Sequence, residues 1–179
     1  MKNILFILVA LYTTSISAQQ INWITFEEAV EAQKTAPKKI FVDAYTTWCG
    51  PCKMLDRNTF ANKDVADYIN ENYYAIKFNA EGAKVINFKG TTYTNPNYDA
   101  NKTGRNSSHE LAGLFGIRAY PTLLFLDEKA NYLGPVPGYR SPRQLEILLK
   151  LFHQDDYKNV TSKEAWEKYA ANFKYEFVE

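Results

Sequence analysis

The sequence predicts an α/β fold, mainly because of three short apolar runs. Residues 39–45, 73–79 and 122–126 are rich in β-branched and aromatic residues, and each run has the length of a buried strand. Helical patterns lie between these runs. The chain of 179 residues is long enough for one domain, which we place over residues 19–179, with a core that needs no disulfide staples.

The helices are predicted from apolar spacing and from capping residues. Thr25 and Glu28 make a capping box for a helix that reaches about Lys34, and Ser141 and Gln144 make a second box with a proline between them. An edge strand is expected over residues 132–136. Three further helices are expected, over about residues 51–58, 64–72 and 108–115.

The C-terminal part of the chain, residues 155–179, adds one more predicted helix. It begins near Ser162 and places Trp166, Tyr169 and Phe173 on one face. We expect this extension to pack on the domain, and a partner surface is the alternative.

The first 18 residues have the pattern of a signal peptide. Lys2 precedes a continuous apolar run over residues 4–12, and small residues around Ala18 offer a cleavage site. An uncleaved anchor is the alternative, but a spanning helix needs about 20 apolar residues. We therefore expect an exported, periplasmic or secreted protein, in a compartment where disulfides persist.

The charge balance gives no sign of a nucleic-acid partner. Removing Lys2 with the leader lowers the count of Lys and Arg from 21 to 20, equal to the 20 Asp and Glu residues. We expect a monomer.

Cys49 and Cys52 are the only cysteines of the chain, and two residues separate them. They lie where the strand over residues 39–45 gives way to a helix. Free N–H groups at a helix N-terminus favour a thiolate and can lower the pKa of a cysteine from about 8.5 to roughly 3.5–7.5. Pro51 suits the first turn, where no N–H is needed. The pair therefore predicts thiol-disulfide chemistry.

The sequence around these cysteines resembles the thioredoxin family. Phe41-Val42-Asp43 followed by Trp48-Cys49-Gly50-Pro51-Cys52-Lys53 is similar to the active-site segment of its reducing members. Residues 116–122 resemble the family segment that ends in a cis-proline before a central strand. The likeness runs from Asn22 to about Leu149. It is similar to exported thioredoxin-like proteins related to periplasmic reductase domains, and it implies a central mixed sheet flanked by helices.

The resemblance implies a role for each site residue. Cys49 would be the nucleophile and Cys52 the resolving cysteine, with Asp43 accepting the proton of Cys52 and Lys77 as partner of Asp43 in one titrating unit. The alternatives are an Asp43 that faces water at the strand end and a Lys77 on the surface.

Substrate contacts are implied for a second group of residues. The Tyr120-Pro121 bond would be cis, with the Tyr120 backbone facing Cys49 and pairing with an extended substrate segment. Trp48 would contact partners, with plain packing as its alternative. Tyr120 differs from the Ile of many thioredoxins. The remaining expected contacts are Gly50 and Pro51.

Residues 82–107 form an insertion that small thioredoxins lack. Their composition shifts to Asn, Thr, Gly and Lys without a clear period, so we expect a long loop. It is either a lid or docking surface near the redox site, or a tolerated surface insertion, which is the interpretation we favour.

These features predict an exported protein-disulfide reductase without a cofactor. Its partners would be disulfide-bearing proteins and a membrane thiol donor of electrons. Gly50 and Pro51 place no charged residue or His between the cysteines, which removes one stabiliser of the thiolate and favours a reductant over an oxidase.

Three other functions are open. The pair could serve a disulfide oxidase or isomerase. It could bind zinc together with His109 and His153, although these lack a short paired spacing. The chain could also be a non-catalytic binding or chaperone module in which the insertion does the work.

Overall fold

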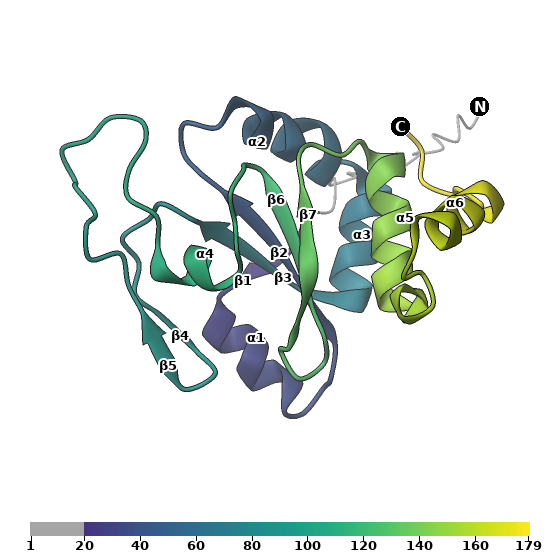
Figure 1. Ribbon diagram of the computed structural model, residues 1–179, viewed down its shortest axis with the longest axis horizontal. Coiled ribbons are helices and arrows are strands. Elements are labelled where there is room, and N and C mark those ends of the chain that lie inside the picture. The colour runs from purple at the N-terminus through teal and green to yellow at the C-terminus, as the bar shows by residue number, and fades with distance from the viewer. Residues whose placement is uncertain (1–19) are drawn as a thin grey trace, which may run out of the picture.

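The computed structural model describes residues 20–179, which are built around a five-stranded mixed sheet (Figure 1). Its neighbours β1, β3 and β2 are parallel, β6 runs antiparallel to β2, and β7 runs antiparallel to β6. The expected mixed sheet is thus confirmed. In spatial order the strands are β1 (Trp23–Ile24), β3 (Tyr73–Asn79), β2 (Lys39–Tyr45), β6 (Thr122–Leu126) and β7 (Tyr132–Pro137).

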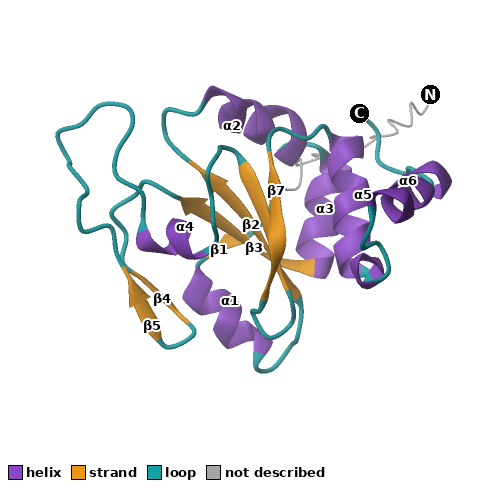
Figure 2. Cartoon of the chain, viewed as in Figure 1, coloured by secondary structure: helices purple, strands orange, loops and turns teal. Residues whose placement is uncertain are grey.

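Helices cover both faces of this sheet (Figure 2). The two predicted capping boxes are present, at Thr25 with Glu28 and at Ser141 with Gln144. The predicted helix after Cys49 is split, because its second half is a π-helical turn, Asp56–Phe60. The helices are α1 (Phe26–Gln33), α2 (Gly50–Leu55), α3 (Lys63–Asn72), α4 (Glu110–Leu114), α5 (Pro142–His153) and α6 (Lys163–Asn172).

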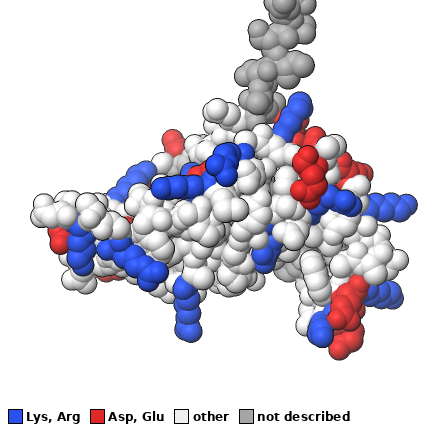
Figure 3. Space-filling model, turned by 90° about the horizontal axis from the view of Figure 1, so that it is seen from above, with Lys and Arg blue, Asp and Glu red and all other residues white. Residues whose placement is uncertain are grey.

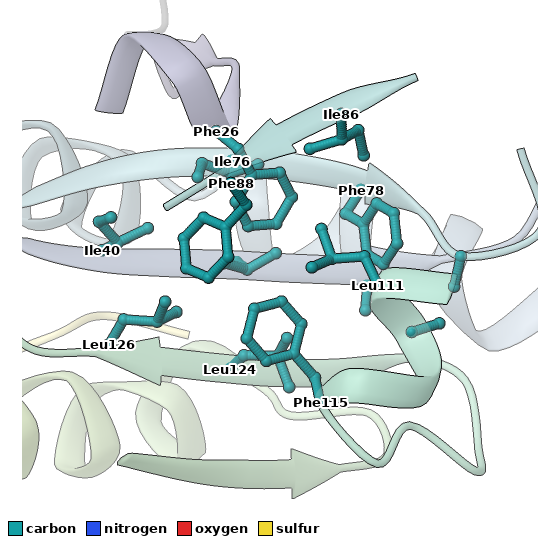
Figure 4. Packing of buried hydrophobic residues seen from close by; sticks show 14 of the residues in the cluster. Phe26, Ile40, Ile76, Phe78, Ile86, Phe88, Leu111, Phe115, Leu124 and Leu126 are labelled. Carbon is teal, nitrogen blue, oxygen red and sulfur yellow. The ribbon is translucent and has the colours of Figure 1, made fainter. Parts of the chain in front are cut away.

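Alternate side chains of β2 enter two different cores. Ile40 and Val42 join α1 and α4 in the core shown in Figure 4. Phe41 points to the opposite face and packs with side chains of α2, α3 and α5, including Leu55. Because successive side chains of a strand alternate, Asp43 shares the face of Phe41. The buried acid therefore lies on the face that α2 covers.

The insertion over residues 82–107 is not simply a loop, and this part of the prediction is wrong. It begins with a hairpin of β4 (Ile86–Phe88) and β5 (Thr91–Tyr93), turned by Lys89 and Gly90 at φ 52° and 80°. Two successive residues with positive φ form a turn whose twist matches that of the two strands it joins. Ile86 and Phe88 are buried against α1 and α4, which anchors the hairpin (Figure 4).

The C-terminal extension packs on the domain, as expected. Trp166 and Tyr169 of α6 contact the core beneath α3 and α5. The tail then returns across α5, where Phe177 is buried and the backbone N–H groups of Glu176 and Phe177 donate to the Glu146 carboxylate.

The signal peptide predicted over residues 1–18 lies outside the described residues. Between residues 20 and 179, no helix is both long enough and apolar enough to cross a membrane.

Candidate active site

Cys49 and Cys52 lie where β2 gives way to α2, as the sequence predicts. Cys49 is the N-cap of α2 and Pro51 occupies its first turn. The two cysteines form a disulfide with their Cα atoms 5.3 Å apart, and the Cys52 N–H donates to Cys49 Sγ at 3.1 Å. This backbone donor, together with the helix N-terminus, would stabilise negative charge on Cys49 once the disulfide is opened.

Both sulfur-bearing residues are nearly covered, Cys49 being 2% and Cys52 3% exposed. Gly50 and Pro51 between them are exposed. A Cβ atom on Gly50 would meet nothing within 4 Å, so this side of the disulfide is open to another molecule. A partner must therefore reach Cys49 across the surface that surrounds these two residues.

The Tyr120-Pro121 bond is cis, as the resemblance implies. It directly precedes β6, whose Thr122 is paired with Ala44 near the end of β2. Since β6 runs antiparallel to β2, its first residues lie at the edge of the sheet where Cys49 begins α2. The half-buried Tyr120 ring meets the Trp48 indole edge to face, at 5.9 Å between centroids.

Besides Tyr120, two further residues contact the Trp48 side chain, Glu81 and Arg105. Its indole N–H donates to Glu81 Oε2 at 2.7 Å, and the same oxygen accepts the backbone N–H of Asn106 at 2.8 Å. The Arg105 guanidinium lies over the ring, 4.5 Å from its centroid, within cation–π range. Glu81 therefore ties the insertion to the tryptophan beside Cys49.

Asp43 and Lys77 are brought together, since β2 and β3 pair them in register. Asp43 is 1% exposed, and within residues 20–179 neither of its carboxylate oxygens accepts a hydrogen bond. The Lys77 ammonium lies 3.3 Å from Asp43 Oδ2 as an ion pair and also contacts Asp56 at the end of α2. Lys77 therefore bridges the buried acid and a carboxylate at the surface.

Burial raises the pKa of the Asp43 carboxyl to about 6, because the charged form loses its hydration. The positive charge of Lys77 acts in the opposite direction, and the negative charge of Asp56 adds to the rise. An acid with this pKa takes up or releases a proton close to neutral pH.

Three residues of this site were missed by sequence reasoning. Asp56 and Arg105 carry no pattern that marks them. Glu81 does carry one, because it follows β3 by two residues, and parallel β2 and β3 end at the same edge of the sheet. Its position near Trp48 follows from the topology.

The two histidines considered as metal ligands are engaged elsewhere. His109 caps α4 with Nδ1, which accepts the Leu111 N–H, while Nε2 lies 2.9 Å from the Lys84 carbonyl oxygen. His153 Nδ1 lies 3.0 Å from the Tyr68 hydroxyl at the end of α5. Among the described residues, no group of three or more His, Cys, Asp or Glu side chains could hold a metal ion.

Comparison with known proteins agrees with this geometry. The family model of the thioredoxin-like domain matches residues 26–153. The thioredoxin of Listeria monocytogenes is 23% identical over 125 residues, which are 70% of this chain and 93% of that protein.

Solved structures also resemble it. A thioredoxin-fold protein from Helicobacter pylori matches with a TM-score of 0.59 and 20% identity, over 83% of this chain and 92% of that one. A protein from Bacteroides thetaiotaomicron, proposed to be a disulphide isomerase, matches with a TM-score of 0.52 and 30% identity, over 75% and 94%. Since the family model spans well over half of the sequence, the chain belongs to the thioredoxin-like oxidoreductase family, with Cys49 and Cys52 as its cysteine pair.

Proposed function

We propose that this chain is an exported protein-disulfide reductase in which Cys49 attacks and Cys52 resolves. The observation that carries the proposal is the Cys49–Cys52 disulfide at the N-terminus of α2, with a buried acid on the sheet face beneath that helix. Thiol-disulfide exchange requires a stabilised thiolate, a second thiol within reach and a proton acceptor for that thiol.

The reaction begins from the reduced dithiol form. The Cys49 thiolate attacks one sulfur of a substrate disulfide, so a mixed disulfide forms and the other substrate sulfur leaves as a thiolate. Cys52 then loses its proton and attacks Cys49 Sγ, which releases the second substrate thiolate. Two electrons pass to the substrate, and the protein is left with the Cys49–Cys52 disulfide. The cysteines carry these electrons themselves, so no cofactor is needed.

Asp43 is the proposed proton acceptor for Cys52, directly or through water. Cys52 is buried in the first turn of α2, and Asp43 lies on the sheet face that α2 covers. General-base help of this kind contributes about 100-fold or more to a rate. Asp43→Asn should therefore prolong the mixed disulfide on the order of 100-fold near neutral pH. An unchanged lifetime in a quenched-flow measurement would remove Asp43 from the mechanism.

Tyr120, Pro121, Trp48, Gly50 and Pro51 are the proposed contacts of the substrate segment. Trp48, Gly50 and Pro51 adjoin Cys49 in the chain, the Tyr120 ring contacts Trp48, and Gly50 and Pro51 are exposed.

The reducing direction and the location are proposed from the sequence. Gly50 and Pro51 add no charged group that would stabilise the Cys49 thiolate further and make the protein more oxidising. The leader pattern over residues 1–18 supports export, and a reductase outside the cytoplasm needs a membrane thiol donor to restore its dithiol. An isomerase or oxidase is the main rival, since one solved relative is proposed to be a disulphide isomerase.

Trapping of mixed disulfides tests this proposal. Cys52→Ser should accumulate a covalent complex with a disulfide-bearing protein, because the resolving thiol is absent. Cys49→Ser is the matched control, because it also keeps one cysteine. It should trap nothing, since the attacking thiol is absent. Equal trapping by both variants, or by neither, would contradict the assigned roles and favour a non-catalytic binding module.

A further inference from the structure

The insertion brings positive charge to the redox site. Arg105 lies over Trp48, and its neighbour Asn106 is tied to Glu81 through its backbone N–H. Lys102 and Tyr98 line one small cavity together with Thr47, which directly precedes Trp48. The segment that follows the hairpin therefore lies beside the surface across which a partner reaches Cys49, which we call the entrance.

Four exposed cations lie on the segments that carry or adjoin the site residues. Within residues 20–179, no ion pair involves any of the four exposed cations at this edge of the molecule. The nearby carboxylate Glu81 is occupied by Trp48 and Asn106. The four cations are Lys53 after the second cysteine, Lys102 and Arg105 in the insertion, and Arg118 before the cis-proline.

The insertion as a whole is also positively charged. Residues 82–107 contain four basic residues, Lys84, Lys89, Lys102 and Arg105, against one acidic residue, Asp99, although the mature chain as a whole is close to neutral. Figure 3 shows the molecule from above: blue side chains occur over both ends, and the larger red groups lie toward the end opposite the insertion.

We propose that the insertion is a specificity element that selects protein disulfides flanked by acidic residues. This inference rests on the proposed reductase function and names its substrate class. A substrate disulfide that approaches Cys49 past Trp48 comes close to Arg105 and Lys102 of the insertion, while Lys53 follows Cys52 in α2 and Arg118 lies two residues before the Tyr120-Pro121 bond. Asp or Glu next to the substrate cysteine would meet unpaired cations there, whereas Lys or Arg would be repelled.

Arg105 is the residue that this arrangement singles out. Its guanidinium is exposed yet fixed over Trp48, so a substrate carboxylate can bind it without ordering a free side chain. Exposed ion pairs of this kind are worth about a two- to fivefold change in an equilibrium or a rate constant. The preference should weaken as salt screens the charges.

The test uses three cyclic disulfide peptides that differ only in the residues next to their cysteines, namely Glu, Gln or Lys. The full-length mature protein is first reduced, and the second-order rate constant for peptide reduction is measured at low and high ionic strength. The Glu peptide should react fastest at low salt. Arg105→Gln should lower the ratio of the Glu-peptide rate to the Gln-peptide rate about two- to fivefold. Arg105→Glu should favour the Lys peptide.

The matched control is Lys168→Gln, which removes the same charge from the exposed face of α6, at the other end of the molecule (Figure 1). It should leave all three rates unchanged. Reduction of the Cys49–Cys52 disulfide by dithiothreitol, measured in each variant, shows whether the cysteine pair itself is altered, and a change of that kind cancels in the ratio of the peptide rates.

The outcomes separate the two proposals. If the wild-type protein reduces all three peptides at one rate, the specificity proposal is wrong and the reductase proposal stands. Equal losses in Arg105→Gln and Lys168→Gln would also overturn the role of the insertion. If no peptide is reduced, the reductase proposal fails and the specificity proposal fails with it.

Discussion

Two buried carboxylates of this protein, Glu146 and Asp43, lie in very different surroundings. Glu146 of α5 is 0% exposed and accepts three hydrogen bonds, from Lys150 Nζ at 2.8 Å and from the backbone N–H groups of Glu176 at 2.8 Å and Phe177 at 3.0 Å. Asp43 of β2 is 1% exposed and, within residues 20–179, accepts none.

The difference separates an anchor, Glu146, from Asp43, the acid that we propose as proton acceptor. A buried carboxylate whose oxygens both accept hydrogen bonds loses little by its burial, and Glu146 uses these bonds to fasten the tail to α5. A buried carboxylate with a single ion-pair partner is held near the point where it gains or loses a proton. Burial alone therefore does not distinguish the two acids. What distinguishes Asp43, the proposed proton acceptor, is that Lys77 is its one polar partner among the described residues.

The largest effect is expected at the anchor. Glu146→Ala leaves two backbone N–H groups without an acceptor and removes the buried partner of the Lys150 ammonium. It should therefore lower the free energy of unfolding by about 3–5 kcal/mol. Urea unfolding of the oxidised protein measures this. The control is Glu176→Gln, which removes the other carboxylate of Lys150, 75% exposed, and should cost less than about 1 kcal/mol. Similar losses in the two variants would contradict the anchor role.

At Asp43, removing the charge should raise the free energy of unfolding instead of lowering it. Its pKa is about 6 in the folded protein against 3.8 for an ordinary Asp, so the folded state binds the proton more tightly. The contribution of Asp43 to stability should therefore fall as the pH rises from about 4 to about 6, and its cost should be complete above that range. Asp43→Asn removes the cost and should raise the free energy of unfolding by about 3 kcal/mol near pH 7.5.

The gain should shrink toward zero as the pH falls through this window. Unfolding of wild type and Asp43→Asn, compared at about pH 7.5 and pH 4.5, checks both the sign and the window. A variant that is less stable than wild type at the higher pH would place Asp43 in the same class as Glu146.

Lys77 should lower the pKa of the Asp43 carboxyl. Its ammonium lowers the pKa of the Asp43 carboxyl, so Lys77→Met should raise that pKa further and move the pH dependence of peptide reduction upward. NMR titration of the Asp43 carboxyl carbon measures the shift directly. A downward shift would mean that Lys77 is not the charge that Asp43 senses.

The smallest effect is expected from Asp56, whose side chain is 43% exposed. Its negative charge raises the pKa of the Asp43 carboxyl, so Asp56→Asn should lower it, opposite in sign to Lys77→Met. Stability should change by less than about 1 kcal/mol. The same NMR titration serves here, and equal signs for the two variants would contradict the Asp43–Lys77–Asp56 arrangement.

Local sequence signals predicted the elements that position the site. The strands β2, β3 and β6 have the predicted bounds, since buried apolar runs are distinct from their surroundings. Both capping boxes and the position of Cys49 at the start of α2 also follow from neighbouring residues. The hairpin after Gly82 was missed, although Ile86 and Phe88 alternate with a polar residue before Lys89-Gly90.

Contacts between distant segments could not be predicted in this way. Arg105 reaches Trp48 across 57 positions of the sequence, and the tail reaches Glu146 across about 30. No short-range pattern specifies either contact, because each depends on where the fold returns the chain. The resemblance to thioredoxins covers neither the insertion nor the tail.

The equilibrium reduction potential of the Cys49–Cys52 pair tests the central claim most directly. It is titrated against glutathione or dithiothreitol, with Trp48 fluorescence and thiol alkylation as readouts. The reductase account predicts a value near or below about −230 mV, on the side of thioredoxin itself. A value above about −180 mV, in the range of disulfide isomerases and oxidases, would contradict it.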